Sequence, residues 1–235
     1  MGYWFRQDSS DRRGKWSDVF RSLGIVLVLY MSFRWILFEP FVIPSGSMEQ
    51  TLLVQDYVVV KKWAYGVRIP FTKSWLGGPT IPERGDIVVF KSKDGSGHFL
   101  VKRVIGLPGE SVSMDQSGVL SINGNPFLYQ TLPADDNDAF APRVENNGSR
   151  SYRVQYYDEG DQTPFEVDVP EGHLFMMGDN RNQSADSRFW GPLPLSHLMG
   201  KLVMIWMSCN ESDSYSSFLC PPKDFRWPRI FKRVD

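Results

Sequence analysis

The sequence has few of the residues on which most hydrolytic and metal chemistry depends. Its 235 residues include three histidines, His98, His173 and His197, and two cysteines, Cys209 and Cys220. The histidines are scattered and the cysteines lack ligand-like companions, so a metal site has no support. None of the histidines lies in a context typical of a Ser-His-Asp enzyme, and no G-x-S-x-G turn is present. The sequence therefore predicts neither a histidine-based triad nor a metal or other cofactor.

An excess of charge of one sign is also absent. The net charge of −1 gives no electrostatic argument for nucleic acid as a partner. No repeat of fixed period is visible either. The chain has many turn-forming residues instead, with 20 glycines and 16 prolines between β-branched apolar runs. This composition favours a β-rich fold with turns over a helix bundle.

One apolar run approaches the length of a membrane helix. A bilayer core needs about 20 helical residues, and residues 19–38 reach that length if Arg21 and Arg34 extend toward the two interfaces. A signal peptide is an alternative, but no small-x-small cleavage site follows the run. A buried helix of a soluble protein is another. Basic residues before the run predict a cytoplasmic tail over residues 1–18, a single transmembrane span and an extracytoplasmic remainder.

Residues 39–235 show the pattern of many short strands, which predicts an all-β domain. Asn123 and Gly124 lie between two apolar runs and predict a hairpin turn. The polar stretch of residues 132–149 is expected to be a loop. Residues 115–170 would form a smaller β subdomain inserted into the main one.

Two serines, Ser45 and Ser47, follow the apolar run directly, within "EPFVIPSGSMEQTLL". A lysine can serve as the base for such a serine if the amine is neutral. Lowering the pKa of lysine from about 10.4 to about 7–8 requires roughly 4 kcal/mol of differential solvation, which burial can supply. Lys102 lies within the apolar strand pattern "FLVKRVIGLPG". Since Lys102 and Arg103 face opposite sides of a strand, one can point inward while the other reaches water. A snorkelling lysine on an edge strand would show the same pattern.

A third dense patch is "FMMGDNRNQSADSRFWGPLP", residues 175–194. Its carboxylates, guanidinium groups and hydroxyls follow an apolar strand. Such a loop can support a site through hydrogen bonds and carboxylate–guanidinium pairs. A purely structural polar turn would have the same composition, so the patch alone does not decide between the two.

Taken in order, "PSGSM", "ERGDIVVF", "VKRVIGLPG" and "GDNRNQSADSRFWG" closely resemble the motif boxes of type I signal peptidase, the bacterial leader peptidase family. The resemblance extends from the apolar run to about Ser208. It implies a fold of coiled, twisted antiparallel sheets with one N-terminal transmembrane helix. One departure is Gln50, where the family pattern often has proline, which puts the local turn in doubt.

The resemblance implies a role for each matching residue. Ser47 would be the nucleophile and Lys102 the general base, while the Ser47 N–H and the Ser45 hydroxyl would form the oxyanion hole. Ser184 would hold the lysine amine in line. Asp186 and Arg188 would pair, and Asp179 and Arg181 would shape the loop nearby. The residues implied to line the substrate pockets are Phe41, Ile43, Met48, Leu52, Leu100 and Val101, although all six could equally be plain core residues.

The implied activity is that of a membrane-anchored serine endopeptidase that removes signal peptides from secretory preproteins with a small-x-small cleavage motif. The implied location is the bacterial inner (cytoplasmic) membrane, with the catalytic domain on the periplasmic side. By composition, the aromatic residues of 63–82 and the basic tail of 223–233 could contact membrane lipid. The alternative is that they pack on the domain or on each other.

Three points stay open at the level of sequence. An oxidising compartment would let Cys209 and Cys220 pair, and the alternative is two free thiols. A Ser-Lys protease dedicated to one specialised substrate would use the same residues. An anchored assembly factor without catalysis would be marked by loss of Ser47, Lys102 or Ser184, and all three are present.

Overall fold

The computed structural model describes residues 10–68, 75–77, 79–93, 95–133, 140–157, 163–210 and 220–234. The first nine residues of the expected cytoplasmic tail, and residues 69–74 and 78 of the segment expected to contact lipid, lie outside the described residues. The chain divides into two compact units, Met1–Phe38 and Glu39–Asp235.

The first unit contains one helix, α1 (Ser10–Leu37), which covers the apolar run. Over the described residues, no helix combines the length and the apolar character that crossing a membrane requires. The span over residues 19–38 therefore stays a prediction.

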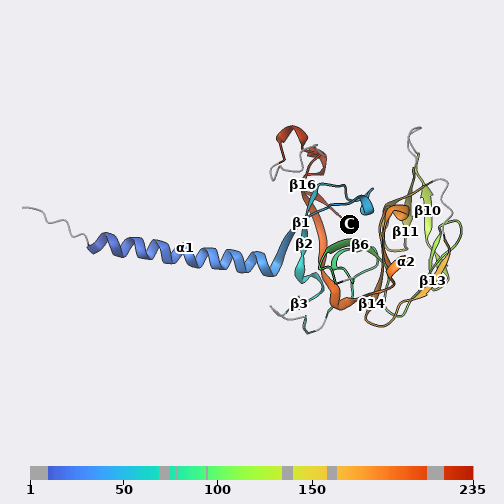
Figure 1. The fold of residues 1–235 in the computed structure, drawn as a ribbon, viewed down its shortest axis with the longest axis horizontal. Helices are drawn as coiled ribbons and strands as arrows, with labels where there is room; N and C mark the ends of the chain where they lie inside the picture. The colour runs from blue at the N-terminus through green and yellow to red at the C-terminus, as the bar shows by residue number, and fades with distance from the viewer. Residues whose placement is uncertain are drawn as a thin grey trace, which may run out of the picture. The chain divides into compact units, whose positions relative to one another are not determined.

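In the second unit, the described residues form an eight-stranded sheet with the order β1, β2, β16, β5, β6, β14, β15, and β17 beside β16 (Figure 1). From β2 to β15 the neighbours pair antiparallel. The register of β16 shifts at three places along β2 and β5, and such bulges increase the local twist. The strands are β1 (Phe38–Val42), β2 (Asp56–Lys61), β5 (Ile87–Lys91), β6 (Phe99–Gly106), β14 (His173–Met177), β15 (Leu193–Pro194), β16 (Leu198–Ser208) and β17 (Lys232–Arg233).

Three smaller antiparallel sheets accompany it within the described residues; one lies within the predicted insert of residues 115–170, and a second lies there except for β7, which precedes it. Their strands are β3 (Val67–Arg68) with β4 (Trp75–Leu76); β10 (Leu128–Thr131), β11 (Phe140–Asn146) and β12 (Ser151–Tyr157); and β7 (Ser111–Met114), β8 (Leu120–Ile122), β9 (Asn125–Pro126) and β13 (Phe165–Asp168). The hairpin predicted at Asn123-Gly124 is confirmed: it joins β8 to β9, and both turn residues have positive φ. The prediction of a β-rich, antiparallel domain is likewise confirmed.

Short helical turns connect the strands. They are α2 (Ser187–Trp190) and the 3-10 turns η1 (Gly46–Met48), η2 (Lys62–Tyr65), η3 (Arg181–Gln183), η4 (Leu195–His197), η5 (Pro222–Asp224) and η6 (Trp227–Arg229). Of these, η1 carries Ser47, and η3 and α2 lie in the third motif patch.

The expectation of a loop over residues 132–149 is wrong for its second half. There β11 pairs with β10 on one side and with β12 on the other. The polar composition suggested a loop because it includes charged residues such as Glu145. In the structure Glu145 is fully buried in this strand, and its carboxylate lies 2.6 Å from Arg181. A charged residue that has a buried partner is compatible with a central strand.

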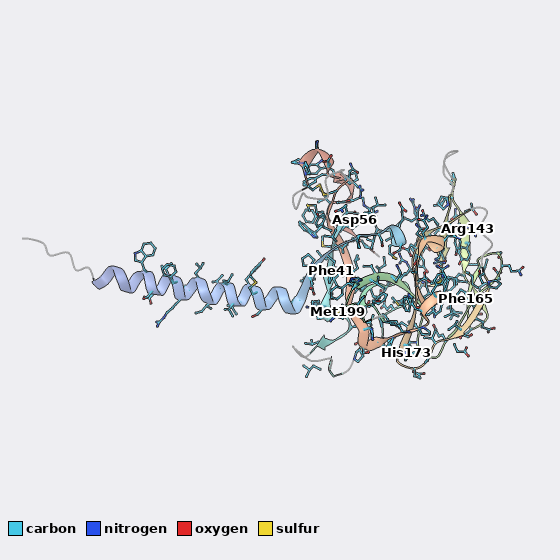
Figure 2. The ribbon with its side chains drawn as sticks, viewed as in Figure 1. Phe41, Asp56, Arg143, Phe165, His173 and Met199 are labelled. Carbon is cyan, nitrogen blue, oxygen red and sulfur yellow. A yellow bond between two sulfur atoms is a disulfide. The ribbon has the colours of Figure 1, made fainter. Side chains whose placement is uncertain are left out.

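Strand β6 contacts all three apolar clusters of the domain. Its Val101 packs on the cluster that contains Ile43 and Met48, whereas Leu100 and Val104 belong to the cluster on the other face. Farther along β6, Ile105 joins the cluster shared with the smaller sheets. Figure 2 shows Phe41 of β1 and Phe165 of β13 on opposite sides of the domain. Both faces of β6 are therefore covered by packed layers.

The C-terminal segment is anchored to the chain that follows Ser47. A disulfide joins Cys209 and Cys220, whose Cα atoms are 6.1 Å apart. Arg229 donates a hydrogen bond to the Thr51 carbonyl at 3.0 Å and forms an ion pair with the buried Asp56. The residues after Ser47 thus depend for their position on a segment far along the chain.

Candidate active site

The Ser47 hydroxyl lies against a buried amine. Ser47 is in the middle of η1, which begins four residues after the end of β1, and the buried Met48 beside it fixes the turn to the core. The Lys102 Nζ lies 2.5 Å from the Ser47 Oγ. Lys102 is in β6, paired with Val88 of β5, and its side chain is only 3% exposed. The fold thus brings together a serine and a lysine that are 55 residues apart.

Burial lowers the pKa of Lys102 from 10.5 to about 8. The charged form loses its hydration in this position, and the cation of Arg188 adds a small repulsion. The carboxylates of Asp186 and Asp179 oppose the shift without cancelling it. The amine is therefore much more readily neutral than an ordinary lysine.

A groove of about 490 Å³ runs from the Ser47–Lys102 pair along β1 and β6. Ser45 also lines it. Of the six residues expected to contact substrate, the structure brings five to its wall, namely Phe41, Ile43, Met48, Leu100 and Val101. The sixth, Leu52, is fully buried in the core behind them and does not line the groove.

Ser184 differs from expectation in its contacts. Its hydroxyl is buried and has no hydrogen-bond partner, so the expected hydrogen bond to the Lys102 amine is not formed in this structure. The hydroxyl lies instead beside Gly178, and the Ser47 carbonyl lies there too. A Cβ at Gly178 would come within 2.3 Å of both oxygens. This position therefore requires glycine for space rather than for backbone freedom.

Asn180 holds the backbone of the Ser47 turn. Its N–H donates to the Ser47 carbonyl at 3.2 Å, and its Nδ2 donates to the Gly46 carbonyl at 3.1 Å. Sequence reasoning assigned no role to Asn180 or Gly178, although both lie within "GDNRNQ". The available signal was that these two residues flank Asp179 at the end of an apolar strand.

The expectation that Lys102 or Arg103 would reach water is wrong, because both side chains are buried. Arg103 points away from the groove and binds Asp179 through two hydrogen bonds of 2.8 Å each. Its guanidinium also donates to the Gly85 carbonyl at 2.7 Å and stacks 3.9 Å from the centre of the Tyr152 ring. The layer of smaller sheets covers this face, so both sides of β6 are interior.

Two further buried ion pairs support the loop after β14. Arg181 binds Glu145 with both guanidinium nitrogens, at 2.6 and 2.8 Å, and both side chains are fully buried. Asp186 and Arg188 form the expected pair, with the Arg188 Nε 2.8 Å from the Asp186 Oδ1. Asp186 also accepts hydrogen bonds from the N–H groups of Gly178 and Arg188. These contacts fix the loop to β11 and to the end of β14.

Gln50 has a backbone conformation that proline cannot adopt. Its φ of 85° lies in the left-handed region, whereas a proline ring fixes φ near about −65°. The Gln50 Nε2 donates to the Gln155 Oε1 of β12 at 2.7 Å. The departure from the family pattern therefore goes with a local turn that a proline at this position could not form.

A serine hydroxyl held against a buried amine, at the wall of an apolar groove, is typical of serine hydrolases that use lysine in place of histidine. No group of three or more potential metal ligands is present within the described ranges.

Residues 16–207 match the family model of signal peptidase, peptidase S26. The chain belongs to this family, and it is accordingly a serine peptidase. A signal peptidase I of Haemophilus influenzae is 35% identical over 93% of this chain and 76% of its own length. A signal peptidase I of Pseudomonas fluorescens is 36% identical over 82% of this chain and 71% of its own.

A solved structure of a signal peptidase I from Enterococcus faecalis is 31% identical in sequence. It covers 52% of this chain and 96% of its own, with a TM-score of 0.33.

Proposed function

We propose that this protein removes signal peptides from secretory preproteins by means of a Ser47–Lys102 dyad. The observation that carries the proposal is the 2.5 Å contact between the Ser47 Oγ and the buried Lys102 Nζ. With a pKa of about 8, about a tenth of this lysine is neutral at pH 7. That fraction suffices for a general base, because the ideal catalytic pKa lies near the working pH.

The proposed reaction has two stages. Neutral Lys102 takes the proton of Ser47 as its oxygen attacks the carbonyl carbon of the scissile peptide bond. The Ser47 N–H and the Ser45 hydroxyl stabilise the oxyanion, and Lys102 then gives its proton to the leaving amine. An acyl-enzyme remains, and a water that loses its proton to the same lysine releases the signal peptide.

The proposed substrate binds as an extended strand. Within the described residues, β1 is the end of its sheet, and β14 pairs with β6 only from Arg103 onward. The edge of β6 beside residues 99–102 is therefore open to the groove. A peptide added there would gain main-chain hydrogen bonds and place alternate side chains in the apolar wall. The apolar wall at Ile43, Met48 and Val101 suits the two small residues of a small-x-small motif.

We also propose that residues 19–38 anchor the enzyme as a single span in the inner membrane, with the catalytic domain on the periplasmic side. The apolar run, the basic residues before it and the family support this arrangement. Anchoring substrate and enzyme in one membrane raises their effective concentration. Protease added to intact spheroplasts should digest residues beyond the span. Protection of the whole chain would contradict the orientation.

The decisive experiment incubates the purified protein with a model preprotein. Ser47→Ala should abolish cleavage while leaving the folded state intact by circular dichroism. Ser121→Ala, at a serine of the smaller sheets, is the matched control and should cleave normally. Cleavage at the same bond by Ser47→Ala would refute the assignment of the nucleophile.

A further inference from the structure

A second hollow of about 260 Å³ adjoins the groove. His98 and Leu100 line both spaces, so the two are direct neighbours. The hollow lies on the Lys102 face of β6, because Leu100 and Lys102 are two residues apart on the strand. Across the strand pair, Phe90 of β5 is in register with Leu100 and also lines the hollow.

The far wall of this hollow is made by the loop that carries Ser184. Ala185 and Trp190 line it, and the Trp190 ring packs against Phe90 with ring centroids 5.9 Å apart. Lys93 fixes this wall from the rim: its Nζ donates to the Trp190 carbonyl at 2.9 Å and to the Pro192 carbonyl at 3.1 Å. The walls are therefore mainly apolar and held in place, with Ser92 and His98 as the other polar lining residues and the Lys93 cation at the rim.

The alternation of an extended peptide determines which substrate side chain meets this hollow. If the proposed function holds, the first and third residues before the scissile bond face Ile43, Met48 and Val101. The second residue before that bond then points to the opposite face, which is the face of Leu100. In a small-x-small motif this is the middle residue.

We propose that the hollow between β5–β6 and Trp190 is a specificity subsite for the second substrate residue before the scissile bond. It takes a large apolar or aromatic side chain. The volume is adequate, since a cavity of about 150 Å³ already accommodates benzene. It disfavours a cationic side chain, because the Lys93 amine lies at the rim. The enzyme thus selects the middle position of the motif as well as the two small ones.

The test uses three preproteins that differ only in the second residue before the scissile bond, which is alanine, phenylalanine or lysine. For the wild-type enzyme we expect kcat/KM to be about tenfold higher with phenylalanine than with alanine, and lowest with lysine. Ala185→Leu fills the hollow and Trp190→Ala removes its wall. Each should bring the phenylalanine-to-alanine ratio to about one. Phe189→Ala is the matched control, because Phe189 is exposed on the same turn and does not line the hollow.

The outcomes separate this proposal from the one on which it rests. Equal cleavage of all three preproteins by the wild-type enzyme leaves the proposed function standing and refutes the subsite. An unchanged phenylalanine preference in both Ala185→Leu and Trp190→Ala refutes the subsite as well. Two variants are used so that the test still holds if one of them does not fold. If the wild-type enzyme cleaves none of them, the proposed function and the subsite both fail.

Discussion

Two adjacent cations on β6 have opposite fates in the same interior. Lys102 and Arg103 are both buried, at 3% and 0% exposure. Burial would lower the pKa of Arg103, but the paired charge and hydrogen bonds of Asp179 outweigh it and raise the pKa above its ordinary value. The Lys102 amine contacts a neutral hydroxyl instead, and its pKa falls to about 8. The difference shows that the bonded partner, and not burial alone, decides in which direction the pKa of a buried cation shifts.

The largest expected effect comes from removing the lysine amine. Lys102→Met keeps an unbranched side chain that is one atom shorter and removes the amine. We expect kcat/KM to fall by about 10³-fold or more, because the base and nucleophile act as one unit. Stability to urea should stay equal or rise, since a poorly solvated amine is removed. Retained cleavage, or a marked loss of stability, would contradict the role given to Lys102.

Replacing the neighbouring Arg103 with methionine should lower the stability of the fold. Arg103→Met leaves the Asp179 carboxylate buried without its cation, which should lower the free energy of unfolding by about 3–5 kcal/mol. Urea denaturation measures the loss. Adding Asp179→Asn to the variant removes the orphan charge and should recover part of the stability. If Arg103→Met were as stable as the wild type, the contrast between the two cations would be lost.

A smaller effect should appear when pH is changed. Because the pKa of Lys102 falls from 10.5 to about 8 on folding, the unfolded chain binds more protons between these values. Stability therefore rises with pH over this window, by about 3 kcal/mol in total. The wild type should gain this amount of stability relative to Lys102→Met. The contributions of all other titrating groups cancel in this comparison, because both proteins share them. Parallel pH profiles of the two proteins in denaturation experiments would refute the shifted pKa.

The pH dependence of activity should also be set by Lys102. The neutral fraction of Lys102 grows as pH passes through its pKa, so kcat/KM should rise about tenfold from about pH 7 to about pH 9 and then level off. Changing any of the three histidines should leave this profile in place. A profile controlled by a group titrating near about 6.5 would point to histidine as the base.

The smallest expected effect concerns Ser184. Its hydroxyl is buried without a partner, so Ser184→Ala should change the free energy of unfolding by no more than about 1 kcal/mol, in the stabilising direction. Any loss of kcat should then reflect alignment of the lysine during turnover. A variant that cleaves at the full rate would show that Ser184 does not position the amine.

The features that could be predicted from the sequence are those determined by residues close together in the chain. The apolar run around Lys102 allowed an inward-pointing lysine without deciding it, and Asn123-Gly124 indicated the hairpin between β8 and β9. The motif boxes placed Ser47 and Lys102 together because a family pattern encodes contacts that spacing alone does not.

The partners of the buried charges escaped prediction because they are distant in the chain. Arg103 meets Asp179 across 76 residues, and Arg181 meets Glu145 across 36. A strand pattern gives the two faces of β6 but not the layers that cover them, so one of Lys102 and Arg103 was expected to reach water. Glu145 in turn gave its strand the polarity of a loop.

The anchoring of the Ser47 turn by the C-terminal segment has a consequence for biosynthesis. Arg229 reaches the Thr51 carbonyl across 178 residues. The ribosome therefore completes the nucleophile long before it makes the residue that steadies the chain next to it. A growing chain carries Ser47 without this anchor until Arg229 has emerged, so a finished active site also reports that nearly all of the catalytic domain has been synthesised and folded.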